Sequence, residues 1–539
     1  MKMMEKQAAG IAVSIAVGLA AFGHAVAADD APRVLQPGLA VTGTIPVGEG
    51  ARLFPLASQR GDFVQGVLDI KGGAVDLDVV DAKRQPVRRL VTKGLGRNTF
   101  LFVASEGDLL RLTATEKDAS YSLEIVRKLA VADQVPPPPS YLSPTIAAAA
   151  ENALKGKGTD AFWADVERTG TPLVELAADG MRIVTFLYRG AKRNVRILGA
   201  PSADHDPLER IEGTDIWFKS YLLPASTRLS YQIAPDIPDL PGTARERRVA
   251  ILATAQADAL NRFPWPADVS DRFNLSSTFV LDGAPAQPFL AARSVDKGQT
   301  TNFEIASPQL GNIRTITLYT PPHFSPDNPD NVLLFLFDGD AYQTKVPTPT
   351  ILDNMIADGV IPPVVAVLVA NPDREARGRE LPDSAGFTAF LADELLPDVV
   401  SRTGMKPVPS RTVLAGSSFG GLAAVRIALV RPDLFGNALS MSGSFWWHPE
   451  NAPAEDGEYI AASVAKNPRA DVRIFLSAGL FEFKGPGPDA GILDANRHLR
   501  DVLRAKGYPI HYREYAAGHD YLAWRGILSD GLIDLFGRH

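Results

Sequence analysis

The chain has 539 residues, of which 45% are hydrophobic and 22% are charged, a composition typical of a folded protein with several domains and not of a disordered chain. Its formal net charge of −7 and its pI near 5.7 exclude the global basic field that marks nucleic-acid binding. The sequence contains no cysteine, which excludes disulfides, a thiol nucleophile, Cys-ligated zinc and iron–sulfur clusters.

Residues 1–27 carry the pattern of a secretory signal peptide. Lys2 and Lys6 give a positive start, residues 10–22 are apolar, and Ala25-Val26-Ala27 offers a cleavage site. The apolar run is shorter than the roughly 20 residues that span a bilayer, so we expect cleavage and no stable membrane insertion afterwards. An exported protein without disulfides is compatible with a Gram-negative periplasm, and the periplasm is the expected location.

Residues 32–130 alternate short β-prone runs with Gly and Asp turns, a pattern that predicts a small β-sandwich accessory domain. Two of these runs, residues 63–70 and 75–80, are predicted as separate strands. The region loosely resembles the bacterial pre-peptidase C-terminal type of module. Residues 131–158 contain four consecutive prolines, Pro136 to Pro139, which favour an extended linker, and then a predicted helix.

Residues 159–290 contain further alternating runs, among them 182–188 and 216–223, and two sheets packed as an immunoglobulin-like sandwich are the simplest interpretation. From 291 to 539 the pattern changes to continuous apolar strands that alternate with helices. This alternation predicts a mostly parallel sheet covered on both faces. The expected fold class is therefore multidomain, with two β-sandwich domains followed by an α/β domain.

A G-x-S-x-G pattern stands in the α/β region, as Gly416-Ser417-Ser418-Phe419-Gly420. By itself this pattern is weak, but here a β-prone stretch precedes it and a helical stretch follows it. Strand, tight turn and helix are the context of the nucleophile elbow of α/β-hydrolases. We therefore expect Ser418 to be the nucleophile of an acyl hydrolase.

A serine needs a base, which in this fold follows the last strand, and an acid, which follows the strand before it. His519 comes directly after the final predicted strand. Glu482 is the first carboxylate past the penultimate strand and is the preferred acid. Asp489, Asp494 and a Ser–His dyad without an acid are the alternatives.

Two backbone N–H groups should bind the developing oxyanion. One is the amide of Phe419, the residue after the nucleophile. The other should come from the loop after the first long apolar strand. We assign it to Asp340, with Gly339 as the alternative.

Several segments resemble the enterochelin esterase family, in its two-domain type with an N-terminal immunoglobulin-like domain. The most specific is Ser442-Gly443-Ser444-Phe445-Trp446-Trp447. Others are the elbow continued by Gly421-Leu422, the run Gly518-His519-Asp520 and, in the N-terminal part, Gly213-Thr214-Asp215-Ile216-Trp217. The resemblance covers about 160–539, and it departs from the family at Asp258-Ala259-Leu260-Asn261, which lacks the family's prolines.

The resemblance implies hydrolysis of the trilactone backbone of a catecholate siderophore such as enterobactin, often as its ferric complex. It implies no cofactor, since iron arrives with the substrate, and no nucleic-acid partner. A ferric tris-catecholate is a flat-ringed trianion that needs cations and aromatic faces. The residues expected to supply them are Arg374, Arg377, Arg379, Trp446, Trp447 and Trp524.

Two other functions remain open from the sequence. A feruloyl or carbohydrate esterase of the same superfamily would use the same catalytic residues, and its aromatic side chains would stack on sugars. A non-catalytic binding protein would sequester a ligand instead. An intact set of Ser418, His519 and Glu482 argues against the second function.

Overall fold

The computed structural model describes residues 34–134, 139–202, 205–267, 271–382, 385–450, 458–483 and 491–537. The expected signal peptide and the first three prolines of the predicted linker lie outside the described residues. The chain divides into two compact units, Met1–Pro139 and Ser140–His539. Among the described helices, none combines the length and the apolar character that crossing a membrane requires.

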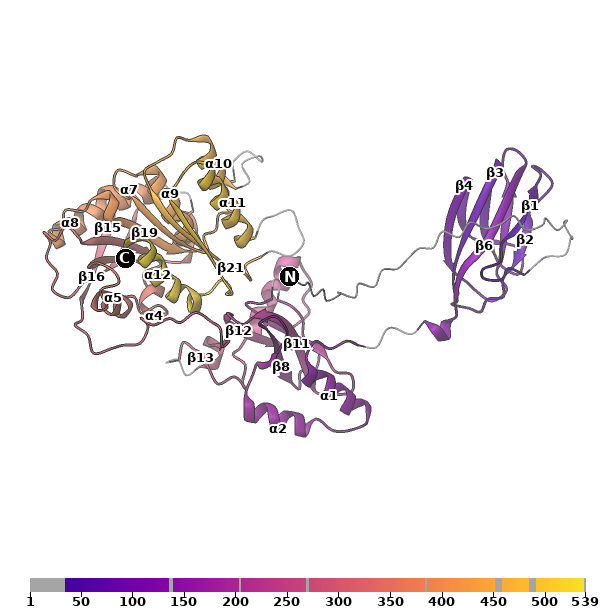
Figure 1. The fold of residues 1–539 in the computed structure, drawn as a ribbon, viewed down its shortest axis with the longest axis horizontal. Helices are drawn as coiled ribbons and strands as arrows, with labels where there is room; N and C mark the ends of the chain where they lie inside the picture. The colour runs from indigo at the N-terminus through magenta and orange to yellow at the C-terminus, as the bar shows by residue number, and fades with distance from the viewer. Residues whose placement is uncertain are drawn as a thin grey trace, which may run out of the picture. The chain divides into compact units, whose positions relative to one another are not determined.

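The first unit is one six-stranded sheet in the order β1-β6-β3-β5-β2, with β4 paired to β3 (Figure 1). The prediction of separate strands over residues 63–70 and 75–80 is wrong, because β3 continues through both. It pairs with β6 before Gly72 and with β5 after it. A Cβ at Gly73 would lie 2.1 Å from the Lys117 carbonyl oxygen, so only glycine lets the strand bend there. The elements are β1 (Val41–Ile45), β2 (Arg52–Pro55), β3 (Phe63–Val80), β4 (Pro86–Val103), β5 (Leu109–Ala114), β6 (Ala119–Leu129) and η1 (Val131–Asp133).

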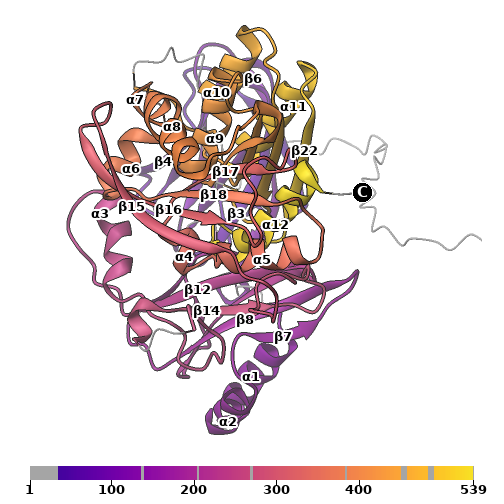
Figure 2. The same cartoon turned by 90° about the vertical axis from the view of Figure 1, so that its left-hand side faces the viewer.

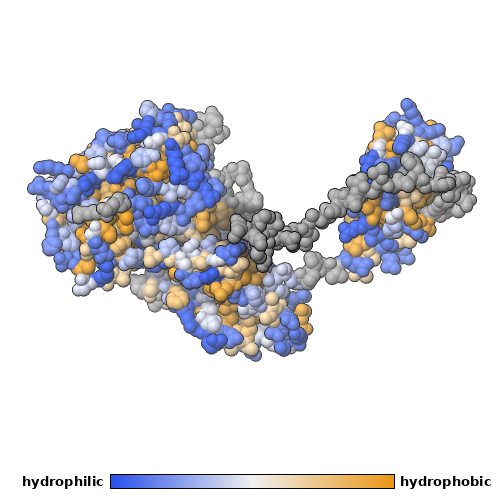
Figure 3. Space-filling view, in the orientation of Figure 1, coloured by the Kyte–Doolittle hydropathy of each residue, from blue (hydrophilic) through white to orange (hydrophobic). Residues whose placement is uncertain are grey.

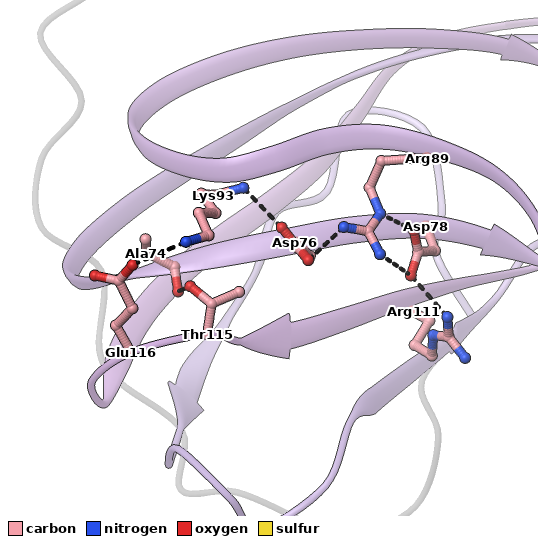
Figure 4. A network of polar contacts seen from close by, with 8 residues as sticks. All are labelled: Ala74, Asp76, Asp78, Arg89, Lys93, Arg111, Thr115 and Glu116. Carbon is pink, nitrogen blue, oxygen red and sulfur yellow. Dashed lines mark hydrogen bonds and ion pairs between the residues drawn. The ribbon is translucent and has the colours of Figure 1, made fainter.

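A cluster of charged side chains in the first unit pairs internally (Figure 4). Asp78 is buried, yet it accepts hydrogen bonds from Arg89 and, at 2.7 Å, from Arg111. Arg89 also donates to Asp76. A buried carboxylate needs such partners, so this cluster has a structural explanation.

The second unit begins with a middle domain, residues 140–290, of two four-stranded sheets. Their orders are β10-β11-β8-β7 and β13-β14-β12-β9. Phe186 of β8 and Tyr231 of β12 belong to one shared core, so the two sheets pack face to face. The elements are α1 (Pro144–Leu154), α2 (Asp160–Thr169), β7 (Leu173–Leu176), β8 (Met181–Arg189), β9 (Val195–Leu198), β10 (Glu209–Arg210), β11 (Ile216–Pro224), β12 (Arg228–Pro235), α3 (Ala244–Val249), η2 (Ala250–Ala253), β13 (Pro264–Trp265), η3 (Arg272–Asn274) and β14 (Ser276–Val280).

The sheet domain, residues 291–537, holds an eight-stranded mixed sheet in the order β15-β16-β18-β17-β19-β20-β21-β22. From β18 to β22 neighbouring strands are parallel, whereas β15 and β16 are antiparallel additions at one edge. Every residue of β17, β18 and β19 is buried, which is why these strands read as continuous apolar runs. The strands are β15 (Gln299–Ser307), β16 (Asn312–Thr320), β17 (Val332–Phe337), β18 (Val364–Val369), β19 (Thr412–Ser417), β20 (Asn437–Met441), β21 (Arg473–Gly479) and β22 (Ile510–Tyr515).

Helices cover both faces of this sheet (Figure 2). One core joins the sheet to α8, α9, α10 and α11, and the other joins it to α5 and α12. Helix α12 also contacts β12 of the middle domain. In the visible face of Figure 3, apolar residues are interspersed among hydrophilic ones. The helices and helical turns are α4 (Ala341–Thr344), α5 (Thr348–Ala357), α6 (Arg374–Glu380), α7 (Ala385–Ala389), η4 (Phe390–Leu395), α8 (Leu396–Thr403), η5 (Pro409–Arg411), α9 (Phe419–Val430), α10 (Tyr459–Lys466), α11 (Ile492–Ala505) and α12 (Tyr521–Phe536).

Candidate active site

The elbow, residues 416–420, turns the chain sharply from β19 into α9. Ser418 occupies the turn with φ 58° and ψ −123°, a conformation that costs energy for a residue with a side chain. A Cβ at Gly416 would lie 2.6 Å from the Gly420 carbonyl carbon. The turn therefore closes only because this position is bare, and it leaves the Ser418 side chain partly exposed.

The parallel strands bring four loops to one edge of the sheet. Ser418 follows β19, Ser442 follows β20, Glu482 follows β21 and His519 follows β22. These strands are consecutive neighbours and all run in the same direction. The loops after their carboxyl ends therefore share one edge, as expected of a ligand site in an α/β sheet.

His519 and Glu482 form a hydrogen-bonded pair across two of these loops. The distance from His519 Nδ1 to Glu482 Oε1 is 2.6 Å, and the Glu482 side chain is only 1% exposed. The second carboxylate oxygen of Glu482 accepts a hydrogen bond from the Gly479 amide at 2.5 Å. Of the alternatives, Asp494 lies in the first turn of α11 and Asp489 lies outside the described residues. The partner of His519 is therefore Glu482.

The Ser418 hydroxyl points toward a second serine. Ser418 Oγ lies 3.2 Å from Ser444 Oγ, and the Ser444 amide donates to the Ser418 carbonyl oxygen at 3.1 Å. Within the described part of the chain no hydrogen bond joins Ser418 to His519. Such contacts are often long in a site without substrate and tighten when it binds.

Two backbone amides near Ser418 are available to an oxyanion. The Gly339 amide donates to the Val369 carbonyl oxygen at 2.9 Å, so it is already used. In the described ranges the amides of Asp340 and Phe419 donate to no acceptor. Phe419 begins α9 and Asp340 precedes α4, where helix geometry leaves N–H groups unpaired. The geometry thus favours Asp340 over Gly339.

Arg377 was expected to bind substrate, but it pairs with the protein itself. Its guanidinium donates to both oxygens of Asp338, at 2.6 and 2.8 Å. Burial opposes the charge of Arg377, but the paired carboxylate outweighs it and raises the guanidinium pKa. Asp338 has a positive φ of 58° and directly precedes Gly339. The pair therefore fixes the loop that carries the Asp340 amide.

The other expected binding residues differ in exposure. Arg374 and Arg379 are exposed on α6, where Arg379 lies within 4 Å of Glu375 and Glu380. Trp446 is 42% exposed and lies against Phe419, with ring centroids 6.2 Å apart. These three side chains can reach a ligand. Nothing among the described residues brings Arg374 into contact with the catalytic groups.

Two of the expected tryptophans, Trp447 and Trp524, pack against other side chains of the protein. Trp447 is half-buried and packs edge-on against Tyr459. Trp524 is only 3% exposed, which corrects its assignment to substrate binding. Its ring lies 4.8 Å from the His519 ring, and its Nε1 donates to Ser442 Oγ at 3.0 Å. Trp524 therefore packs against the His519 imidazole and helps to fix its position.

The middle domain contacts residues 516–520, which we call the His519 loop. The Arg228 amide donates to the Ala516 carbonyl oxygen at 3.0 Å, and Ser230 hydrogen-bonds the Asp520 carboxylate. Burial raises the pKa of Asp520. A Cβ at Gly518 would lie 2.5 Å from the Cβ of Ala200. The sequence analysis missed these contacts, because nothing in the local pattern links residues near 200 to a loop near 518.

A pocket of about 450 Å³ lies at this junction, with His519 in its wall. The sheet domain contributes Glu482, Phe483 and Asp520, and the middle domain contributes Ser202, His205, Ser230 and Arg248. Among the described residues no three His, Asp or Glu side chains cluster in a way that could hold a metal ion. The site is thus built from polar and aromatic side chains of two domains.

Comparisons with known proteins find esterases that are similar to the second unit. Two family models match: "Enterochelin esterase, N-terminal" over residues 183–290 and "Putative esterase" over residues 307–535. The iron(III) enterobactin esterase of Dickeya dadantii (strain 3937) is 33% identical, over 69% of this chain and 92% of its own length. Among solved structures, the ferric enterobactin esterase of Salmonella typhimurium has a TM-score of 0.57 at 30% identity, covering 70% of this chain and 98% of that one. The enterobactin esterase of Shigella flexneri, solved in the presence of enterobactin, has a TM-score of 0.56 at 30% identity over 70% and 98%.

Proposed function

The chain belongs to the enterochelin esterase family, a family of ester hydrolases, and from this premise we propose that it hydrolyses the trilactone backbone of a catecholate siderophore. Ser418 is the nucleophile, His519 the base and Glu482 the acid of the proposed site. The observation that carries the proposal is the 2.6 Å contact between His519 and the buried Glu482, on loops beside the one that carries the elbow. A base oriented by a carboxylate next to an elbow serine is the arrangement of acyl transfer.

In the first step Ser418 attacks a lactone carbonyl. The His519 Nδ1–H donates to Glu482, which leaves Nε2 free to take the Ser418 hydroxyl proton as the Oγ–C bond forms. The tetrahedral intermediate collapses with cleavage of the C–O bond of the ester. His519 returns its proton to the departing alkoxide, and the acyl group stays on Ser418.

In the second step water releases the acyl group. His519 takes a proton from water while the water oxygen bonds the acyl carbon. The bond to Ser418 Oγ then breaks and the serine recovers its proton. No cofactor is needed, and iron enters only as part of the substrate.

The oxyanion of both intermediates would lie between the Phe419 and Asp340 amides. Neither amide has another acceptor among the described residues. Preorganised donors of this kind contribute about 3–4 kcal/mol each to the transition state. The Asp338–Arg377 pair would hold one of them in place, so Arg377 acts as a positioning residue in this proposal.

The activities of the relatives support the substrate class. The Dickeya dadantii protein is an iron(III) enterobactin esterase, and a 30% identical Escherichia coli relative is an iron(III) salmochelin esterase. The exposed Arg374 and Arg379 and the exposed ring of Trp446 would meet the anionic, aromatic periphery of such a ligand.

The finer fold and the location belong to the same proposal. The elbow between β19 and α9 and the parallel order of β18 to β22 support an α/β-hydrolase domain. The two packed sheets of the middle domain support an immunoglobulin-like sandwich. The periplasm is proposed from the pattern of residues 1–27, and fractionation of cells that express the full chain would test it.

Hydrolysis of ferric enterobactin, followed by the masses of the linear products, tests the proposal. The wild-type protein should open the trilactone, and Ser418→Ala should slow it by about 10⁴-fold or more. Ser417→Ala is the matched control, since Ser417 lies one residue away and is fully buried in β19. Wild-type activity in Ser418→Ala, or wild-type protein that leaves the trilactone intact, would contradict the proposal.

A further inference from the structure

The middle domain contacts the His519 loop directly. Arg228, Ser230 and Ala200 contact residues 516–520. In the opposite direction Phe481, which follows β21, packs into the core shared by the two middle-domain sheets. The two domains therefore contact each other through the loop after β21 as well as through the His519 loop.

The pocket at this meeting point lies on the His519 side of the site. Its lining includes His519 and Glu482, and it does not include Ser418. During acylation His519 must protonate the departing oxygen, so the leaving portion of the ester has to lie within reach of this imidazole. A pocket in the wall next to His519 is where that portion would enter.

The chemistry of the pocket fits an anionic aromatic group. Arg248, near the end of α3, is exposed and lines the pocket together with His205 and the hydroxyls of Ser202 and Ser230. Phe483 also lines the pocket and is 43% exposed. The volume of about 450 Å³ falls within the roughly 300–1,000 Å³ of small-molecule sites. A guanidinium and an aromatic face are the groups that recognise a flat anion.

Resting on the proposed function, we infer that this two-domain pocket binds a catecholate ring of the leaving portion of the substrate, with Arg248 as its specificity-determining residue. The middle domain is then part of the active site and not only an attachment to it. Arg248 touches the substrate and leaves the ester chemistry to Ser418 and His519.

Steady-state kinetics with ferric enterobactin test the inference. Arg248→Ala should raise KM for ferric enterobactin about tenfold or more, the loss expected of one charge-assisted contact. The loss should fall on KM and not on kcat, since Arg248 exchanges no proton with the ester. Arg248→Lys should recover part of the KM. Arg245→Ala is the matched control, since Arg245 is an exposed arginine of the same helix outside the pocket.

Direct binding gives a readout that does not depend on hydrolysis. In calorimetric titration, 2,3-dihydroxybenzoate should bind Arg248→Ala about tenfold more weakly than it binds the wild type or Arg245→Ala. Equal binding in all three proteins would overturn the inference, and so would a loss of Arg248→Ala activity that appears in kcat with KM unchanged. Intact ferric enterobactin with wild-type protein would instead overturn the proposed function, and the titration would still decide the role of Arg248.

Discussion

The elbow and the His519 loop carry the two proposed proton-exchanging residues, yet different parts of the molecule hold them in place. The contacts that hold the elbow among the described residues lie in the sheet domain: Gly416 faces Gly420, and the Ser418 amide donates to the Met441 carbonyl oxygen at 3.0 Å. The His519 loop is held from outside, by Ala200 and Ser230 of the middle domain. The nucleophile is thus a local product of one strand–turn–helix, whereas the base depends on the packing of two domains.

This difference indicates how a substitution in the elbow and a substitution in the His519 loop would each damage the site. A change in the elbow meets backbone atoms that cannot move without breaking the turn. A change in the His519 loop meets side chains of another domain, which a second substitution can remove. The following predictions use this contrast, from the largest expected effect to the smallest.

Among the changes in the two loops beyond Ser418 itself, Glu482→Gln should have the largest effect. Glutamine keeps the shape but removes the negative charge that orients and stabilises the His519 imidazolium, so kcat should fall by about 10²- to 10⁴-fold. Steady-state hydrolysis of p-nitrophenyl acetate measures this loss, and circular dichroism checks the fold. A loss below about tenfold would favour a Ser–His dyad.

Gly416→Ala should damage the elbow beyond repair by any second side-chain change. The added Cβ would lie 2.6 Å from the Gly420 carbonyl carbon, so the turn must shift and displace Ser418. Displacements of about 1 Å cost about 100-fold in rate. Labelling by a fluorophosphonate probe should slow to a similar degree. Labelling at the wild-type rate would contradict the close approach in the turn.

Gly518→Ala should have a smaller and reversible effect. Its Cβ would lie 2.5 Å from the Cβ of Ala200, so the His519 loop or the middle domain must yield. We expect about a tenfold loss of kcat, in line with a partial displacement of the base. The double variant Gly518→Ala, Ala200→Gly should recover most of the activity, because the clashing methyl group is gone. Failure of this rescue would mean that the middle domain does not brace the loop.

Asp520→Asn should change the pH dependence of stability more than the activity. Burial raises the pKa of Asp520 in the folded protein. The stability that the protonated carboxyl contributes is therefore fully present below the ordinary pKa of 3.8, and it is lost as the pH rises through the folded pKa. Asparagine stays neutral, and it caps α12 about as well as aspartate does. The Tm of the variant relative to wild type should therefore rise from pH 4 to pH 8. A constant difference across this range would contradict the assignment.

Much of the sheet domain could be predicted, because its signals are local. Strands buried on both faces must be apolar throughout, and β17 and β18 show this directly in their residues. The antiparallel edge strands β15 and β16 carry no comparable signal of direction, since strand direction depends on the partner. In the first unit the sequence analysis divided β3 into two strands at Gly72 and Gly73. Two glycines in a row are compatible with a turn between strands and equally with a bend within one strand. Only the pairing of β3 with β6 and β5 distinguishes the two cases.

The residues of the candidate site show the same division between those indicated by local sequence and those decided by tertiary contacts. The G-x-S-x-G pattern in its strand–turn–helix context selected Ser418, and position after a strand selected His519 and Glu482. The loops of the parallel strands do share one edge. The arginines and tryptophans of the substrate site were expected only from the substrate that the family resemblance implies and from their residue types. Residue types could not show that Arg377 would pair with Asp338 or that Trp524 would be buried behind His519.

By itself, the sequence determined the strand–turn–helix around Ser418, because that geometry depends on glycines and apolar residues a few positions apart. It also determined the order in which the base and acid candidates follow the nucleophile. The tertiary structure decided which carboxylate meets His519, which amide beside Asp338 is unused, and that Ala200, Ser230 and Arg248 of the middle domain adjoin the base. These outcomes depend on contacts between residues that are tens to hundreds of positions apart, and such contacts leave no periodic trace in the chain.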